Sequence, residues 1–272
     1  MAANLHELLD VIARWIHVIA GIMWIGNSML WNWIDRNLAK GSKGDEAEGR
    51  SIGSIWLLHS GAFYHMEKTL WPGNPIPAPM HWFKWQSYIT WMSGAALLVI
   101  VYYLSGAALL LGTNSAIDAT TAIAISAASI LLAWPIYNLL KFNAVTGLLA
   151  LLAISFGYTC VFSGRAAFLH VGALLATIMA GNVFMVIMPS QRQLVAAVEK
   201  GEDTVPALAA RAKARSIHNN YLTFPVLVLM LSSHFPGLYG HRYNWLLLGV
   251  LVLAGASVRH FMNIRFTQPR WK

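Results

Sequence analysis

Five histidines lie within long apolar runs or at their ends, and they are the residues of this chain best suited to chemistry: His17, His170, His218, His234 and His260. An imidazole inside a bilayer is costly, so it usually faces the interior of a helix bundle. There it binds a metal, carries protons or contacts a ligand. The sequence therefore predicts a membrane protein with buried reactive groups.

Two of these histidines begin similar segments. His17 and His170 are each followed by valine, and each segment reaches a Gly-Asn pair within about three helical turns. Two such helices could offer imidazoles from opposite sides to the iron of one haem b. Arg14 would pair with a haem propionate or, at i, i+4, with Asp10. Trp24 would contact the cofactor or pack in the core. A hydrogen bond to a neighbouring helix is the alternative for each histidine.

A second polar group is predicted at the opposite ends of the helices. It comprises His218, Asn219 and Asn220 at the start of one helix, Arg259, His260 and Arg265 at the end of the next, and Phe63, His65 and Glu67 in an amphipathic segment. Guanidinium groups supply charge, amides bond to ring edges and aromatic rings stack, so this group suits a planar, nitrogen-rich anion. The alternative is an ordinary interfacial rim. A second haem between His218 and His260 is also conceivable.

Composition predicts the elements that position these groups. Hydrophobic residues make up 57% of the 272 residues, charged residues make up 11%, and the mean hydropathy is +0.54. Because one span needs about 20 apolar residues, we expect an all-α integral membrane protein with about seven transmembrane helices. Their expected ranges are 9–33, 86–104, 121–140, 145–162, 167–188, 217–234 and 243–263. Pro135 is expected to kink the third helix near its end, and Pro189 to end the fifth.

The basic residues orient these spans. With the N-terminus outside, 16 of the 19 Lys and Arg residues fall on the inner side, which is the charge bias of membrane proteins. We expect an N-out, C-in topology, one domain over residues 1–272, and cytoplasmic connections at 35–85 and 189–216. The first connection includes the amphipathic segment at 51–70. The net charge of +8 then reflects the inner loops and indicates no nucleic-acid partner. The single cysteine, Cys160, excludes an internal disulfide and a CxxCH haem-attachment site.

Short motifs spread over nearly the whole chain are distinctive in combination. They are Gly61-Ala-Phe-Tyr-His65, His81-Trp-Phe-Lys-Trp85, Tyr88-Ile-Thr-Trp-Met-Ser-Gly94, Met188-Pro-Ser-Gln-Arg192, Ser216-Ile-His-Asn-Asn-Tyr-Leu-Thr223, Arg242-Tyr-Asn-Trp245 and Arg259-His-Phe-Met-Asn-Ile-Arg265. The combination resembles the bacterial membrane-bound urate oxidases, which are cytochrome c-linked urate hydroxylases that form 5-hydroxyisourate. The resemblance implies a multi-pass enzyme of the bacterial inner membrane.

The resemblance also implies roles for individual residues. The expected catalytic residues are His65, Glu67, His218 and His260, and the expected urate-binding residues are Phe63, Asn219, Asn220, Arg259 and Arg265. The segment from His17 to Gly26 resembles small haem-binding membrane oxidoreductases, which supports His17 as a haem ligand. Many members of the family carry a C-terminal cytochrome c domain on the outer side. This chain has no CxxCH, so electrons are expected to pass through the haem to a separate cytochrome c or another acceptor.

Two other functions fit the same residues. A transporter or channel for a purine-like anion would use the inner polar group, and its histidines would relay protons. A haem electron-transfer protein would have no substrate of its own. Visible absorption of the purified protein separates the haem enzyme from the transporter. A paralogous enzyme with a different substrate is also left open.

Overall fold

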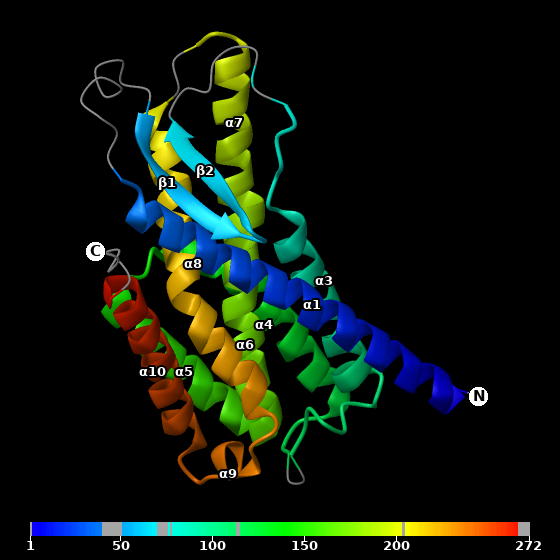
Figure 1. Ribbon diagram of the computed structural model, residues 1–272. Coiled ribbons are helices and arrows are strands. Elements are labelled where there is room, and N and C mark those ends of the chain that lie inside the picture. Colours follow the sequence, from blue (N-terminus) through cyan, green and yellow to red (C-terminus); the bar gives the residue numbers. More distant parts are fainter. Residues whose placement is uncertain are drawn as a thin grey trace.

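Helices make up most of the chain in the computed structural model (Figure 1), which describes residues 2–39, 51–69, 76, 78–112, 115–202 and 205–265. The helices are α1 (Ala2–Asn37), α3 (Trp85–Leu98), α4 (Ala119–Leu140), α5 (Ala144–Val161), α6 (Gly164–Asn182), α7 (Met188–Glu199), α8 (Pro206–Ser232), α9 (Pro236–Tyr239) and α10 (Asn244–Arg265). Two π-helical turns, η1 (Val99–Tyr103) and η2 (Val183–Ile187), extend α3 and join α6 to α7. Each helix expected from hydrophobicity has a counterpart here.

Five helical stretches are long and apolar enough to cross a membrane. They are Asn4–Asn37, Ala119–Leu140, Ala144–Val161, Gly164–Glu199 and Asn244–Ile264. The fold is therefore compatible with a membrane protein, as the composition predicts. Seven spans would also require α3 with η1, and α8. That count and the N-out, C-in orientation stay predictions.

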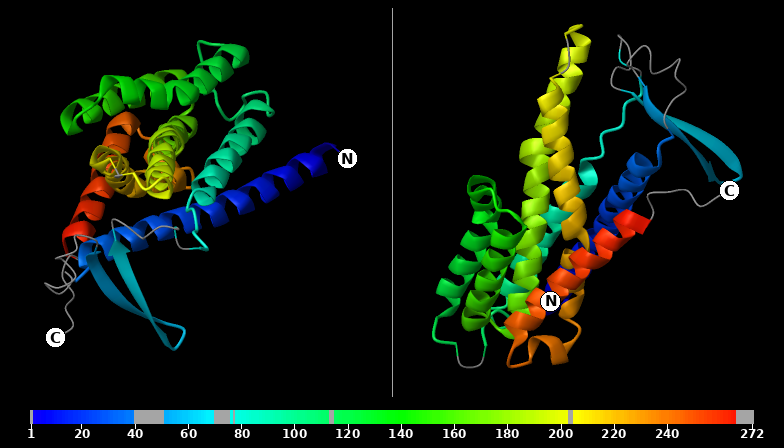
Figure 2. Two further views of the ribbon diagram at one scale, coloured as in Figure 1. Left: turned by 90° about the horizontal axis from the view of Figure 1, so that it is seen from above. Right: turned by 90° about the vertical axis from the view of Figure 1, so that its left-hand side faces the viewer.

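The bundle is centred on α6. In the most apolar 18-residue segment of Gly164–Glu199, 72% is buried, whereas the corresponding share in α1 is 6%. Viewed from above, α4 and α5 lie on one side of α6 and α8, and α1 lies on the other (Figure 2). The apolar core surrounds Phe168 and Val171 of α6 and includes Leu229 of α8 and Leu248 of α10, all fully buried. The peripheral α1 instead exposes Trp15 and other large apolar side chains, as a lipid-facing helix would.

Side-chain caps begin three of the helices. The Asp118 carboxylate accepts from the Thr121 amide at 2.8 Å, and Asn143 with Thr146 forms a capping box on α5. The hydrogen bonds from Thr121 hold the pKa of the Asp118 carboxyl below its ordinary value. Ser163 accepts from the Ala166 amide at 3.2 Å and begins α6. These caps fix where α4, α5 and α6 begin, and hence the depth of His170 in the bundle.

Two predicted helix boundaries are wrong. The fifth helix does not end at Pro189, because η2 precedes the proline and the helix continues as α7 to Glu199. A proline lacks an N–H and crowds the preceding turn, and a local π-turn accommodates it. The sixth helix begins at Pro206, so the predicted cytoplasmic connection at 189–216 consists largely of α7 and the first turns of α8.

The expectation of an all-α fold is wrong for the amphipathic segment, which forms an antiparallel hairpin of β1 (Ser51–His59) and β2 (Ala62–Thr69). Ser60 and Gly61 connect the strands with φ of 51° and 76°. Positive φ at both central residues matches the twist of a two-residue hairpin and is easiest with glycine present. The hairpin is attached to the end of α1 by an Ala39–Ser54 bridge and by Lys68 Nζ, 2.6 Å from Asp35 Oδ1.

Candidate functional site

A cavity of about 350 Å³ lies between α1 and α10 at the end of the bundle where α1 terminates. Its lining includes Leu30, Asn32, Trp33, Arg36, Arg259 and Asn263. Two arginines from two helices therefore border one cavity of the size that holds small ligands. We call it the charged cavity.

Arg259 of this lining is buried, with 4% of its surface exposed. Its Nε donates to the Asn220 side-chain oxygen at 3.1 Å, and its guanidinium lies 5.7 Å from the centre of the Phe224 ring. Asn263 donates to the same Asn220 oxygen at 3.1 Å, and Arg36 donates to the Asn263 carbonyl at 3.2 Å. Within the described residues, no carboxylate pairs with Arg259.

The buried amide of Asn220 adds a second unmet requirement. Its Nδ2 has no hydrogen-bond partner among the described residues. Buried cations are normally paired, and a buried polar group without a partner costs about 1–3 kcal/mol. A buried guanidinium without an acid is satisfied by an anion that also carries hydrogen-bond acceptors. The charged cavity is therefore suited to a small polar anion.

A second cavity, of about 590 Å³, lies on another face of α1. Its lining includes Trp24, Asn27, Trp31, His81, Gln86 and Asn219, and none of its described lining residues is Asp, Glu, Lys or Arg. We call it the neutral cavity. Asn32 borders both cavities, so the two flank the same half of α1.

Asn219 holds the wall of the neutral cavity through a buried hydrogen-bond chain. Trp134 donates to Asn182 at 3.2 Å, Asn182 donates to Asn219 at 2.9 Å, and Asn219 donates to the Met179 carbonyl at 2.9 Å. These three hydrogen bonds join α4, α6 and α8 immediately before the π-turn η2. Both ends of the Asn219 amide are thus engaged, and this residue positions the wall.

The chain matches a known protein family. The model of the family described as "Urate oxidase N-terminal" matches residues 3–271, which is nearly the whole chain. The chain belongs to this family. No curated protein and no solved structure matches it. The urate oxidase resemblance expected from the motifs is confirmed at the level of the family.

The urate oxidase family membership gives the predicted inner polar group a context, and the structure brings only part of that group together. Arg259 lines the charged cavity and donates to Asn220, which is not among the lining residues, whereas Asn219 borders the neutral cavity. His218 and His260 each face a phenol, with Nδ1 at 2.8 Å from the hydroxyls of Tyr137 and Tyr221. Arg265 was predicted to bind urate, but its side chain is outside the part of the chain that the structure describes.

The hairpin carries three further residues predicted for the urate site. Phe63 is 74% exposed, and His65 and Glu67 are exposed as well. The His65 ring lies 4.6 Å from the ring of Trp56 on the paired strand. None of the three is among the described residues that line either cavity.

Substitution of the two polar hairpin residues is expected to have little effect. His65→Ala and Glu67→Gln should each change urate turnover by no more than about twofold, because neither side chain reaches a cavity and exposed substitutions are usually nearly neutral. Turnover measured at saturating urate, with the wild type alongside, checks this. A loss of ten-fold or more would instead place the hairpin over the reacting substrate.

His17 and His170, the predicted haem ligands, differ in how their ring nitrogens are engaged. His170 is fully buried, with Nε2 2.6 Å from the Ser126 hydroxyl and Nδ1 2.7 Å from the Ala166 carbonyl, so both ring nitrogens are engaged. His17 Nδ1 lies 2.9 Å from the Thr90 carbonyl, an arrangement that leaves Nε2 for another partner. To ligate a haem iron, His170 would have to give up one of these two hydrogen bonds. No group of three or more His, Cys, Asp or Glu in the described chain could hold a metal ion.

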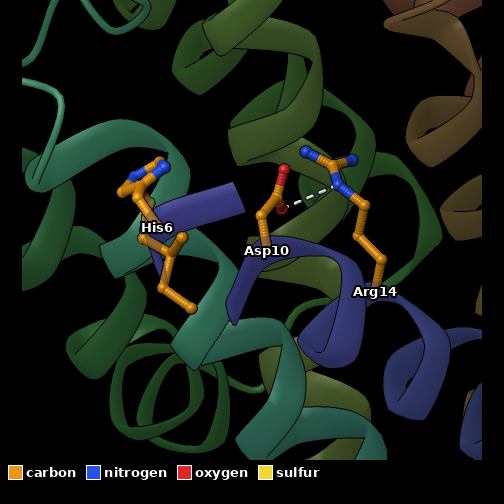
Figure 3. A network of polar contacts seen from close by, with 4 residues as sticks. His6, Asp10 and Arg14 are labelled. Carbon is orange, nitrogen blue, oxygen red and sulfur yellow. Dashed lines mark hydrogen bonds and ion pairs between the residues drawn. The ribbon is translucent and has the colours of Figure 1, made fainter. Parts of the chain in front are cut away.

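Arg14 and Trp24, the two residues expected to support the haem, do not lie at one common site. Arg14 points along its own helix to Asp10, with Nε 2.7 Å from Oδ1, as Figure 3 shows with His6 one turn before. This is the i, i+4 alternative to a propionate contact. Trp24 borders the neutral cavity. Haem ligation by His17 and His170 stays a prediction, and no step of the function proposed below passes through it.

Replacing His170 tests its structural role against the haem prediction. We expect His170→Ala to lower the free energy of unfolding by about 2–4 kcal/mol, since it removes two hydrogen bonds and leaves a cavity in the core. Thermal unfolding in detergent measures this change. A visible absorption spectrum identical to that of the wild type supports the structural role, whereas loss of a Soret band would establish His170 as a ligand.

Most residues that line the neutral cavity were not predicted as site residues from the sequence. Trp24, Asn27, Ser28 and Trp31 recur at positions i, i+3, i+4 and i+7 of α1, which places them on one helical face. That periodicity was a usable signal. The segment before α3 contributes His81, which belongs to a sequence motif for which no role was predicted.

Proposed function

We propose that this protein oxidises urate to 5-hydroxyisourate and that urate binds in the charged cavity. The observation that carries the proposal is Arg259, a buried cation whose described partners are amides and an aromatic ring. Urate is a planar anion with carbonyl oxygens and ring N–H groups around its edge. It would supply the counter-charge that Arg259 lacks, and family membership makes it the plausible substrate.

Within this proposal, the lining residues have separate roles. Arg259 and Arg36 supply positive charge, and Asn220, which accepts from Arg259, holds that guanidinium in place. The Trp33 indole forms an apolar wall. We propose His260 as the proton acceptor: it is not among the described lining residues, but it adjoins Arg259 in sequence, and its hydrogen bond to Tyr221 joins the same two helices.

We also propose the membrane-bound, cytochrome c-linked subtype, in the bacterial inner membrane with seven spans. Five apolar helices and the motifs quoted above support this placement. A separate cytochrome c would dock at the opposite end of the bundle, where His241 and Arg242 are exposed and the Arg242 guanidinium lies over the Tyr243 ring at 4.6 Å. Redox encounters of this kind bury little surface and are transient.

The test is urate oxidation by the purified full chain in phospholipid vesicles without oxygen. With ferricyanide as the acceptor, we expect two ferricyanide ions to be reduced per urate consumed, and heavy oxygen from labelled water to appear in 5-hydroxyisourate. Urate that accumulates inside the vesicles unchanged would contradict the proposal and identify a transporter. Hydrogen peroxide formed in proportion to urate in air would contradict the dehydrogenase-type electron flow.

A further inference from the structure

The neutral cavity is not explained by urate binding. Urate is an anion, and an anion in a cavity without a cation is strongly disfavoured relative to one beside two arginines. The charge distribution on the two faces of α1 therefore separates two kinds of ligand. The charged cavity suits an anion, and the neutral cavity suits an uncharged one.

The lining of the neutral cavity indicates the shape of that ligand. Trp24, Trp31, Trp82 and Phe83 provide flat apolar walls, and the Trp31 and Phe83 rings pack edge to face at 5.4 Å. The side chains of Trp31, Met80 and Phe83 are 38%, 44% and 46% exposed, so the cavity has an apolar rim. A flat ring with an apolar tail matches these walls and this rim.

The polar groups of the cavity are free to bind such a ring. Asn27, Gln86 and Gln191 belong to α1, α3 and α7, and none of their side chains has a hydrogen-bond partner within the described part of the chain. Asn32 and Asn219 of the same lining are already engaged. Amide donors from three separate helices suit a planar molecule with carbonyl oxygens at opposite ends of its ring.

We propose that the neutral cavity binds a membrane quinone, which is the first electron acceptor of the reaction and would precede any cytochrome. This inference rests on the proposed urate oxidation. Urate, water and quinone would give 5-hydroxyisourate and quinol. A water oxygen forms a bond to C5 of urate, two electrons leave the urate ring, and two protons are released. The quinone takes up both electrons and both protons as its two carbonyls become hydroxyls.

Quinone binding is measured first without urate. Decylubiquinone is titrated into the full chain in detergent, and quenching of tryptophan fluorescence reports binding near Trp24, Trp31 and Trp82. We expect saturable quenching that the double variant Asn27→Leu/Gln86→Leu weakens at least ten-fold. Gln193→Leu, an exposed position on α7 outside the described cavity lining, is the matched control. Equal quenching in the double variant and the wild type would overturn the proposal.

Electron transfer is measured second, with urate and decylubiquinone in the absence of oxygen. We expect one quinol per urate, and a raised KM for quinone in the double variant at unchanged KM for urate. Urate-driven ferricyanide reduction without quinol formation would overturn the acceptor role while leaving the proposed function standing. If urate reduces neither acceptor, the proposed function fails, and the fluorescence titration still decides whether the cavity binds quinone.

Discussion

Arg259→Gln is expected to lower kcat/KM for urate by about two to three orders of magnitude. Removing one partner of a buried, hydrogen-bonded charge pair costs about 2–5 kcal/mol, and each 1.4 kcal/mol is tenfold. Glutamine keeps a hydrogen bond to Asn220 feasible, so the loss should report mainly on charge. Steady-state kinetics with ferricyanide and an isotherm for urate binding measure the effect.

Two further variants separate charge from folding. Arg259→Lys should recover only part of the affinity, because an ammonium group lacks the planar fork that bonds to two acceptors. Arg211→Gln removes an exposed arginine of α8 and should behave as the wild type. If Arg259→Gln retains normal urate affinity with an intact fold, urate does not bind at the charged cavity.

Gly255→Ala is expected to destabilise the crossing of α8 and α10 and to abolish urate binding. A Cβ at residue 255 would lie 2.8 Å from the Pro225 nitrogen and 3.0 Å from the Phe224 carbonyl carbon, and both belong to the backbone. Neither can rotate away, so the helices must separate, at about 1–3 kcal/mol for overpacking of this kind. Because Arg259 lies one turn beyond Gly255, the separation also moves the guanidinium away from Asn220.

Gly157→Ala provides the matched control for this substitution. A Cβ at Gly157 of α5 would meet no atom within 4 Å. The same change there should be neutral or stabilise by about 0.5–1 kcal/mol, because alanine is the better helix former. Melting temperatures and urate affinities of the two variants measured side by side give the comparison. Equal behaviour would show that the α8–α10 crossing tolerates expansion.

Helix positions were predictable from this sequence because apolar runs of span length are a strong, local signal. The ranges around Pro135 and the start of α5 agree with the structure to within a few residues. Pro189 misled the prediction, since a proline after a π-turn does not interrupt the helix. The hairpin was missed because alternating and helical periodicities are hard to separate in a short amphipathic segment, although Ser60-Gly61 offered a turn signal.

The candidate site was predictable only where two residues could be placed at the same depth. Asn220 near the start of one predicted span and Arg259 near the end of the next were expected to meet, and they do. Which face of a helix each residue occupies was not predictable. Neighbouring residues of α8 therefore separate, with His218 directed to α4, Asn219 to α6 and Asn220 to α10. Periodicity gives the angle between such residues but not the neighbour that each one meets.

The helical stretch from Gly164 to Glu199 continues from α6 through the π-turn η2 into α7 without a loop. Its 36 residues span roughly 54 Å at about 1.5 Å per residue, well beyond a hydrocarbon layer of about 30 Å. The last part of this stretch, α7, lies beside the first turns of α8, and the two extend past the other helices of the bundle (Figure 2). The π-turn η2 joins α6 to α7, and its residues Val183 and Ile187 border the neutral cavity. The protruding end of the protein is therefore connected to the cavity wall by one continuous helix, without an intervening loop.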